Sequence, residues 1–312
     1  MKVLVTGSSG FLGRHLTKKL ESEGQEVVAL NSKECDLTQQ GSLERKLEGS
    51  KFEHIYHLAT YTRAGPFCAK HPGEMWVRNQ KIDTNALDFW REKQPQAKMT
   101  AIGSSCAYDP SLPFVEENYL KGTPLGNFFS YGNSKRMLLV GLQSLNKEFG
   151  LKYNCPIPTT LYGPDYHLDG RPLHFVYDLM RKIIRAKKNP DKPVVLWGDG
   201  SQEREIIHVN DFINIMEGVD SKEENQLYNL GSGKGYTIKD FAQMICGEVG
   251  YDFSEVQFDT TKNVGAKSKV FPLDKMKKLY GKEYQEKDMS EGIKESVSWM
   301  LEHKDHFLSN YD

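Results

Sequence analysis

The stretch Lys2-Val-Leu-Val-Thr-Gly-Ser-Ser-Gly-Phe-Leu-Gly13 decides the fold. Its first five residues form a short apolar, β-branched run that predicts a buried strand, and Arg14 to Ser22 predict a helix. A Gly-x-x-Gly-x-x-Gly loop between a first strand and a first helix is typical of dinucleotide-binding folds. Gly7 allows the tight turn, Gly10 lets the backbone approach a pyrophosphate, and Gly13 permits close packing of helix on strand.

Strand and helix patterns then alternate to about residue 157, which predicts an α/β fold with a doubly wound parallel sheet of the Rossmann type. We expect residues 1–160 to form a dinucleotide-binding domain, residues 205–230 to return to it, and residues 161–312 to form mainly a smaller α/β lid that binds substrate. The expected strands are 25–30, 53–59, 97–102, 152–157 and 193–197, and the expected later helices are 131–148, 173–186 and 237–249.

The end of the second predicted strand bears on the choice of cofactor. It carries Asn31-Ser-Lys33, with no acidic residue where an NAD enzyme usually holds the ribose diol. Lys33 is placed to meet a 2′-phosphate, which favours NADP(H) and leaves NAD(H) open. Asp36 and Leu37 follow at the expected adenine edge. His57, in the third predicted strand, is interpreted as structural.

Tyr131-Gly-Asn-Ser-Lys135 adds a proton-transfer pair. On a helix the two ends of this segment share a face, and the Lys135 ammonium favours the phenolate of Tyr131 and lowers the tyrosine's pKa. Ser104, just past the fourth predicted strand, lies at the sheet edge where ligands bind and can hydrogen-bond the same substrate oxygen. These residues predict proton transfer at a carbonyl or alcohol oxygen while a hydride moves at its carbon. The expected cofactor-binding residues are Gly7, Ser9, Gly10, Phe11, Leu12, Gly13, Asn31, Lys33, Asp36, Leu37, Leu58, Ala59, Tyr131 and Lys135.

Composition narrows the class of protein. The 312 residues carry a net charge of −1, so no global basic field attracts nucleic acid or a membrane surface. The apolar stretches are strand-sized, and the first predicted strand begins at residue 2, so we expect neither a transmembrane helix nor a signal peptide. Five cysteines without a Cys-x-x-Cys spacing predict free thiols in a cytoplasmic protein, and the nine histidines form no metal-ligand pattern.

These motifs together resemble the extended short-chain dehydrogenases/reductases that act on nucleotide sugars. Within them, the sequence is most similar to the GDP-L-fucose synthase group (GDP-4-keto-6-deoxy-mannose 3,5-epimerase/4-reductases) and related GDP-heptose C4 oxidoreductases. The resemblance covers nearly the whole chain. The segments that carry it are 6–13, 103–108, Tyr131 with Lys135, 158–164, 197–211 and 262–267.

The resemblance implies roles for individual residues. Ser104, Tyr131 and Lys135 would form the reductase triad, Cys106 the epimerisation base and His174 its acid partner. This chemistry is coherent, because a 4-ketone acidifies the C3 and C5 hydrogens and a thiolate can remove one. The implied substrate-binding residues are Lys182 and Arg204 at the diphosphate, Trp197 near the nucleotide, and Lys267.

Departures from the family pattern leave the sugar and the epimerisation open. Thr160 replaces a usual Asn, Phe128-Phe-Ser precedes Tyr131, Pro156 is an added proline, and residues 62–76 are unlike the usual loop. Two further enzymes remain alternatives: a GDP-manno-heptose-type C4 dehydrogenase without epimerisation, and a UDP-hexose 4-epimerase.

Two other functions that this fold can have, 4,6-dehydration and non-catalytic nucleotide sensing, are disfavoured. Ser105-Cys106 stands where 4,6-dehydratases carry Asp-Glu, and a non-catalytic nucleotide sensor would be expected to have lost the tyrosine or the lysine. By analogy with relatives, some of which serve capsule polysaccharide biosynthesis, we expect a homo-oligomer, such as a dimer through the helices that bear the Tyr/Lys motif.

Overall fold

The structure is a computed structural model that describes residues 1–312 except 63–65, 190, 263–265, 282–285 and 310–312. The chain divides into two compact units. Unit 1 comprises Met1–Thr159, Phe212–Leu230 and Pro272–Glu283, and unit 2 comprises Thr160–Asp211, Gly231–Phe271 and Tyr284–Asp312.

Unit 1 is built on a six-stranded parallel sheet with the order β10-β5-β4-β3-β1-β2. Its strands are β1 (Lys2–Thr6), β2 (Glu26–Leu30), β3 (His54–His57), β4 (Lys98–Ala101), β5 (Tyr153–Pro158) and β10 (Gln226–Leu230). The strand order reverses between β1 and β3, and in open α/β sheets the ligand crevice lies at the carboxyl ends of the strands at such a point. The predicted doubly wound Rossmann-type sheet is confirmed.

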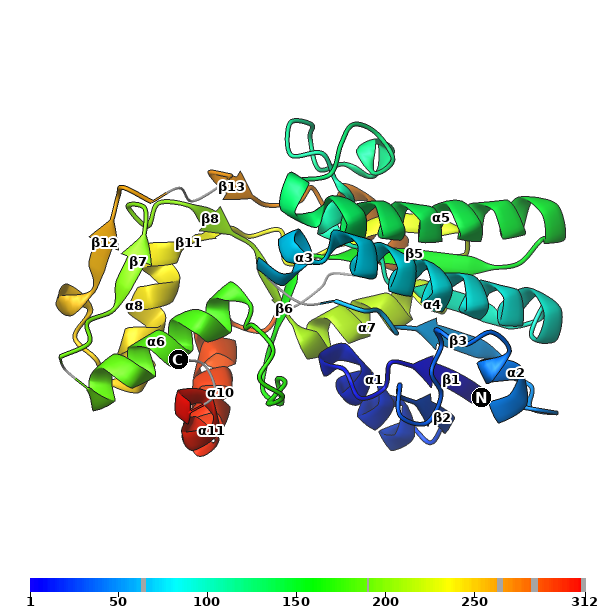
Figure 1. The fold of residues 1–312 in the computed structure, drawn as a ribbon, viewed down its shortest axis with the longest axis horizontal. Coiled ribbons are helices and arrows are strands. Elements are labelled where there is room, and N and C mark those ends of the chain that lie inside the picture. The colour runs from blue at the N-terminus through cyan, green and yellow to red at the C-terminus, as the bar shows by residue number, and fades with distance from the viewer. Residues whose placement is uncertain (63–65, 190, 263–265, 282–285, 310–312) are drawn as a thin grey trace. The chain divides into compact units, whose positions relative to one another are not determined.

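Helices flank this sheet (Figure 1). They are α1 (Phe11–Ser22), α2 (Ser42–Lys46), α3 (Pro66–Lys70), α4 (Pro72–Lys93), α5 (Phe129–Phe149), α7 (Val209–Asp220, in unit 1 from Phe212) and α9 (Asp274–Tyr280). On one side, α4 and α5 run alongside each other, with Gly141 of α5 so close to Leu87 of α4 that a Cβ would lie 2.5 Å from its Cδ1. On the other, Lys19 of α1 pairs with Glu217 of α7 at 2.9 Å.

Helix α4 is absent from the sequence-based expectations. Its inward face includes buried polar side chains, Asn79 and Asp83, among Met75, Ile82 and Ala86. These polar residues interrupt the apolar spacing by which an amphipathic helix is recognised. Helix α1 also begins at Phe11, three residues earlier than expected, because the glycine loop leads directly into its first turn.

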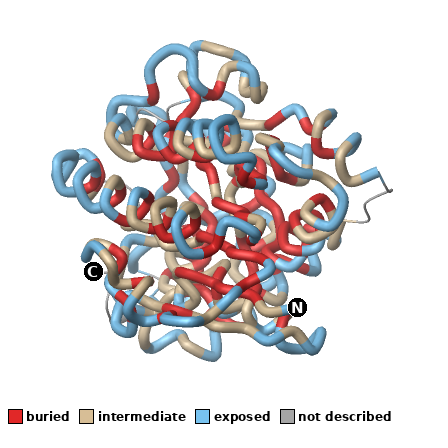
Figure 2. Tube along the Cα trace, turned by 90° about the vertical axis from the view of Figure 1, so that its right-hand side faces the viewer, coloured by how far each residue is buried: buried red, intermediate tan, exposed pale blue. Residues whose placement is uncertain are grey.

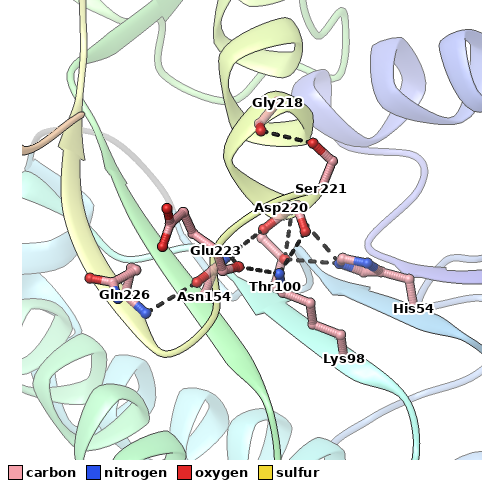
Figure 3. A network of polar contacts seen from close by, with 9 residues as sticks. All are labelled: His54, Lys98, Thr100, Asn154, Gly218, Asp220, Ser221, Glu223 and Gln226. Carbon is pink, nitrogen blue, oxygen red and sulfur yellow. Dashed lines mark hydrogen bonds and ion pairs between the residues drawn. The ribbon is translucent and has the colours of Figure 1, made fainter. Parts of the chain in front are cut away.

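A buried polar network at the amino ends of the strands joins α7 to the sheet (Figure 3). The Asp220 carboxylate accepts hydrogen bonds from Asn154 Nδ2 at 2.7 Å and from Thr100 Oγ1 at 2.8 Å. His54 Nε2 lies 2.9 Å from the same threonine hydroxyl, and Lys98 Nζ donates to the backbone oxygen of Asp220 at 2.7 Å. The network lies at the sheet edge opposite the expected cofactor site.

Unit 2 consists of small sheets and helices. The strands are β6 (Thr160–Tyr162) with β9 (Ile206–His208), β7 (Val195–Trp197) with β12 (Gln257–Asp259), and β8 (Glu203–Arg204) between β11 (Tyr236–Thr237) and β13 (Ser268–Lys269). The helices are α6 (Phe175–Lys188), α8 (Ile238–Val249), α10 (Met289–Glu302) and α11 (Lys304–Ser309). A capping box between Thr237 and Asp240 begins α8.

The buried residues follow the strands and the inward faces of the helices (Figure 2). Val3, Leu4 and Val5 of β1 are fully buried, as expected for a central strand covered on both faces. None of the helices in the described ranges is both long and apolar enough to cross a membrane.

Candidate active site

The glycine loop occupies the point where the strand order reverses. Gly7 has φ +72°, and a Cβ there would lie 2.7 Å from the backbone nitrogen of Ala59 and 2.8 Å from the carbonyl carbon of Leu58. A Cβ on Gly13 would lie 2.3 Å from the Gly7 oxygen. The ends of β1 and β3 and the start of α1 therefore meet at atomic contact, and the structure brings Gly7, Gly13, Leu58 and Ala59 together.

The start of α1 suits an anion. The helix begins directly after Gly10, so the backbone N–H groups of its first turn have no partners within the helix. Such N–H groups and the positive end of the helix dipole bind phosphate. Arg14 Nη1 donates to the Ser9 oxygen at 2.5 Å and fixes the preceding loop. Ser9, Gly10, Phe11 and Leu12 lie at this helix start.

The loop after β2 contains an acidic residue that the sequence reasoning missed. Glu34 Oε2 accepts hydrogen bonds from the backbone nitrogen of Asn31 at 3.2 Å and from its Nδ2 at 2.6 Å. Asn31 Oδ1 in turn accepts from the Lys33 nitrogen at 2.9 Å, while the Lys33 side chain is exposed. A lysine and a glutamate therefore stand in the same loop, and its charge alone does not select between the two nicotinamide cofactors.

Asp36 and Leu37 are held by local contacts. The Asp36 carboxylate accepts from the Thr38 nitrogen at 2.9 Å, and hydrogen bonds from Thr38 lower the pKa of Asp36. The Leu37 side chain is buried, and its carbonyl accepts from Asn85 Nδ2 at 2.8 Å. Of the two, Asp36 therefore has the side chain that reaches the surface.

Tyr131 and Lys135 occupy one face of α5. Lys135 is only 3% exposed and Tyr131 is partly buried. Burial raises the pKa of Tyr131, and the nearby charge of Lys135 opposes that rise. The expected direction of the lysine's influence is present, but the expectation of a net lowered pKa is wrong because desolvation of the phenolate outweighs it. At neutral pH the phenol carries its proton.

The Ser104–Cys106 segment forms a 3-10 turn over Ser105–Ala107 directly after β4. Ser104 Oγ accepts the Cys106 N–H at 3.1 Å, so its own hydroxyl hydrogen can be donated to a substrate oxygen. Cys106 is partly exposed, whereas Cys35, Cys68, Cys155 and Cys246 are buried. Cys106 is therefore the thiol that solvent and substrate can reach.

The turn and α5 are in close contact. A Cβ on Gly132 would lie 2.4 Å from the Cys106 oxygen. The thiol of Cys106 is near enough to Tyr131 to contribute to the raised pKa of that tyrosine. Ser104, Cys106, Tyr131 and Lys135, which are 31 positions apart from first to last, thus gather in unit 1 at the carboxyl edge of the sheet.

Thr60 and Thr62 are further residues of this site. Both hydroxyl groups lie close enough to the Tyr131 phenol to oppose the rise of its pKa, and Thr60 Oγ1 donates to Asn79 Oδ1 at 3.0 Å. The sequence rule that ligands sit past the carboxyl ends of parallel strands could have found them, because they follow β3. His57 of β3 is buried with its ring nitrogens 2.9 Å from Thr6 Oγ1 and 3.1 Å from Asp83 Oδ1, which supports its structural interpretation.

The remaining candidate residues belong to unit 2. His174 stands at the N-cap of α6, where water still reaches the ring, yet the protein packed around it and the positive charge of Lys269 lower its pKa. Lys182 Nζ pairs with Asp178 at 2.9 Å. The side chain of Trp197 on β7 is 61% exposed.

Arg204 and Lys267 are neighbours. Arg204 Nη1 donates to the Glu203 oxygen at 2.7 Å and to the Ala266 oxygen at 3.0 Å, and the Glu203 nitrogen donates to the Lys267 oxygen at 2.8 Å. The structure therefore places Arg204 of β8 beside the backbone segment that carries Lys267, directly before β13. The central part of the 262–267 motif, residues 263–265, lies outside the described residues.

The fold and site define a Rossmann-type oxidoreductase that binds a nicotinamide dinucleotide. Residues 3–231 match the family described as "NAD dependent epimerase/dehydratase family". The chain belongs to this NAD-dependent epimerase/dehydratase family.

Two similar curated proteins are bacterial. GDP-L-fucose synthase of Escherichia coli is 27% identical over 322 residues, which cover 98% of both chains. GDP-L-colitose synthase of Yersinia pseudotuberculosis is 25% identical, with 98% of this chain and 100% of that protein covered.

Two solved structures share the fold. A GDP-L-fucose synthetase from Naegleria fowleri bound to NADP has a TM-score of 0.84 and 23% identity, covering 97% of this chain and 95% of that one. A GDP-mannoheptose C4 reductase from Campylobacter jejuni with NADP bound has a TM-score of 0.84 and 21% identity, covering 96% and 98%.

Proposed function

We propose that the protein is a nucleotide-sugar oxidoreductase that transfers a hydride between NADP(H) or NAD(H) and C4 of a GDP-linked deoxyhexose or heptose. The observation that carries this proposal is the gathering of Ser104, Tyr131 and Lys135 at the sheet edge that also bears the glycine loop. The curated relatives named for GDP-sugars supply the substrate class.

The protein's own residues would handle the proton at O4 while the bound nicotinamide supplies or accepts the hydride at C4. Ser104 donates its hydroxyl hydrogen to the sugar oxygen, since its Oγ already accepts the Cys106 N–H. Tyr131 gives its phenolic proton to the same oxygen, and its raised pKa keeps that proton available at neutral pH. Lys135 stabilises the phenolate that results, and the nearby hydroxyl groups of Thr60 and Thr62 favour the phenolate as well.

Epimerisation at C3 and C5 is the second proposed activity. Cys106 would remove a proton acidified by the 4-ketone, and His174 would supply one. The lowered pKa of His174 keeps its imidazole neutral in the free protein, so this role needs substrate charge, such as the diphosphate, to favour its protonated form. A C4 oxidoreductase without epimerisation remains the alternative. A UDP-hexose 4-epimerase is less favoured, because its reaction would give Cys106 and His174 no role.

Unit 2 is proposed to hold the nucleotide. Arg204, Lys182 and Lys267 are cations suited to a diphosphate, and Lys182 would exchange its pairing with Asp178 for a phosphate oxygen. Trp197 presents an exposed aromatic face on which a guanine ring can stack.

A homodimer is proposed through α4 and α5. Val77 and Trp76 of α4 and Met137 and Val140 of α5 are apolar side chains that are 37–50% exposed. A second copy of these helices would cover them. With five free thiols, we place the enzyme in the cytoplasm, in a route to GDP-sugars for polysaccharides such as capsules.

The proposal is tested by identifying what co-purifies with the protein by mass spectrometry, followed by turnover assays. GDP-4-keto-6-deoxy-mannose and GDP-heptoses would each be offered with NADPH, NADH and their oxidised forms. Cofactor-dependent change at C4 of any of these sugars supports the proposal. Turnover of UDP-hexoses alone would replace it with the 4-epimerase alternative.

A further inference from the structure

The 3-10 turn that carries Cys106 is held at its start by a buried tyrosine. The phenolic oxygen of Tyr119 accepts the backbone N–H of Ser104 at 3.1 Å, and Tyr119 is 0% exposed. Ser104 is the residue at which the segment after β4 enters the turn. A buried N–H that loses its acceptor is costly, so this hydrogen bond fixes the backbone of Ser104 in one place.

The same turn is held at its end by a buried arginine. Arg136 Nε donates to the Ala107 oxygen at 2.8 Å, while its Nη1 and Nη2 donate to the oxygens of Gly122 and Lys121 at 2.8 and 2.6 Å. Arg136 follows Lys135 on α5 and is 6% exposed. Its rigid planar guanidinium thus joins the helix that bears Tyr131 and Lys135 to the turn that bears Cys106.

The residues around Tyr119 leave room for its phenol and hold its ring in place. A Cβ on Gly103 would lie 3.1 Å from the Tyr119 oxygen, so the absence of a side chain at Gly103 lets the phenol reach the strand end. Tyr119 lies in the segment between Asp109 and Thr123. The Asp109 carboxylate accepts the Thr123 N–H at 2.7 Å and so joins the two ends of this segment. The Tyr119 ring packs edge-on against Tyr108 with centroids 5.3 Å apart.

We propose that Tyr119 and Arg136 are positioning residues that clamp the turn at both ends and set where Ser104 and Cys106 stand relative to Tyr131. This inference rests on the proposed function of those three residues. Neither clamp residue meets substrate. Both act through the turn, and proton transfer depends on sub-ångström placement of donor and acceptor.

Tyr119→Phe tests the clamp because it removes only the phenolic oxygen. Tyr108→Phe is the matched control, because Tyr108 is 2% exposed in the same aromatic cluster and its hydroxyl donates to Asn229 Oδ1 at 2.7 Å, away from the Ser104 backbone. The readouts, taken on the NADPH-bound enzyme, are amide hydrogen exchange over residues 101–108 and alkylation of Cys106 by iodoacetamide. We expect Tyr119→Phe to raise exchange at Ser104 about ten-fold and to change the alkylation rate about three-fold, with Tyr108→Phe within about two-fold of wild type in both.

Arg136→Lys supplies an independent arm, since one ammonium keeps the charge but cannot serve three carbonyls. With GDP-4-keto-6-deoxy-mannose as probe, both Arg136→Lys and Tyr119→Phe should lower kcat about ten-fold and change KM less than about two-fold. Identical behaviour of Tyr119→Phe and Tyr108→Phe in exchange and alkylation overturns the clamp.

The proposed function and the proposed clamp can be distinguished by comparing two variants. A Tyr131→Phe variant that keeps its turnover would remove the proposed function whatever Tyr119→Phe does. An inactive Tyr131→Phe beside a wild-type-like Tyr119→Phe would leave the function in place and remove only the clamp.

Discussion

The backbone oxygen of Cys106 lies so close to Gly132 that a Cβ at that position would stand 2.4 Å away. Contact at this distance leaves no room for a methyl group, so Gly132→Ala must displace the turn from α5. We expect a loss of about 1–3 kcal/mol in the free energy of unfolding and a larger fall in turnover than the stability loss explains. Urea denaturation and steady-state kinetics measure the two effects.

Gly73→Ala is the control for this prediction. Gly73 also lies in a helix, but a Cβ there would meet nothing within 4 Å. The Gly73→Ala variant should leave turnover unchanged and should stabilise α4 slightly. Equal effects of the two variants would mean that the turn and α5 do not depend on this contact.

Gly7→Ala should disable cofactor binding. The new Cβ would lie 2.7 Å from the Ala59 nitrogen, which must move and open the loop. Gly24→Ala shares the backbone strain, because Gly24 has φ +76°, but a Cβ there would meet nothing within 4 Å. By fluorescence titration with NADPH, Gly7→Ala should bind at least about ten-fold more weakly, and Gly24→Ala like wild type. Equal affinities in the two variants would contradict the placement of the cofactor.

Cys106→Ser should abolish solvent deuterium incorporation at C3 and C5 of a 4-keto substrate while NADPH still binds. The hydroxyl is far less acidic than the thiol, so it cannot serve as the base. Cys155→Ser is the control, because Cys155 is fully buried. Mass spectrometry of the recovered sugar gives the result. Wild-type protein that incorporates no deuterium would assign the chain to C4 redox chemistry without epimerisation.

The buried network of Figure 3 should give two opposed pH dependences. Burial raises the pKa of Asp220 to about 6, so the folded state holds a proton that the unfolded state releases, and stability falls as pH rises from about 4 to 6. Burial lowers the pKa of His54 to about 3, so stability is lost as pH falls below about 6.5. Between about pH 4 and 6 the two slopes have opposite signs, and each is at most about 1.4 kcal/mol per pH unit.

Single substitutions should separate the slopes. In Asp220→Asn, the free energy of unfolding should rise with pH over this range more steeply than in wild type, because His54 then acts alone. In His54→Gln, the free energy of unfolding should fall with rising pH more steeply than in wild type, because Asp220 then acts alone. Urea denaturation at pH 4.5, 5.5 and 6.5 tests this, with the exposed Asp252→Asn as control. Slopes that change in the same direction in both variants would contradict the assignment.

The sequence predicts the parallel sheet of this protein better than it predicts helix α4. The strand–glycine loop–helix unit at Lys2–Ser22 and the alternation that follows it rest on local rules of turn and periodicity, so the parallel sheet was predictable. Helix α4 was not, because Asn79 and Asp83 are buried where its apolar face should continue. Such polar positions make sense only once their partners, Thr60 and His57, are known.

Some features of the candidate site also follow from the sequence, and others depend on tertiary packing. Tyr131 and Lys135 are four residues apart on a helix, so their shared face follows from sequence alone. The approach of Cys106 to Gly132 and of Tyr119 to Ser104 joins segments distant in the chain and depends on tertiary packing. The net direction of the Tyr131 pKa shift also depends on burial, which no spacing rule supplies.

In the proposed reaction, Tyr131 protonates the sugar oxygen while hydride reaches C4. This step can be followed by incubating the enzyme with GDP-4-keto-6-deoxy-mannose and NADPH deuterated at both C4 positions of the nicotinamide. Wild type should yield a reduced sugar one mass unit heavier with deuterium at C4. Tyr131→Phe should bind NADPH normally and form that product at least about 100-fold more slowly, because it lacks the acid. Undiminished deuterium transfer by Tyr131→Phe would contradict the account.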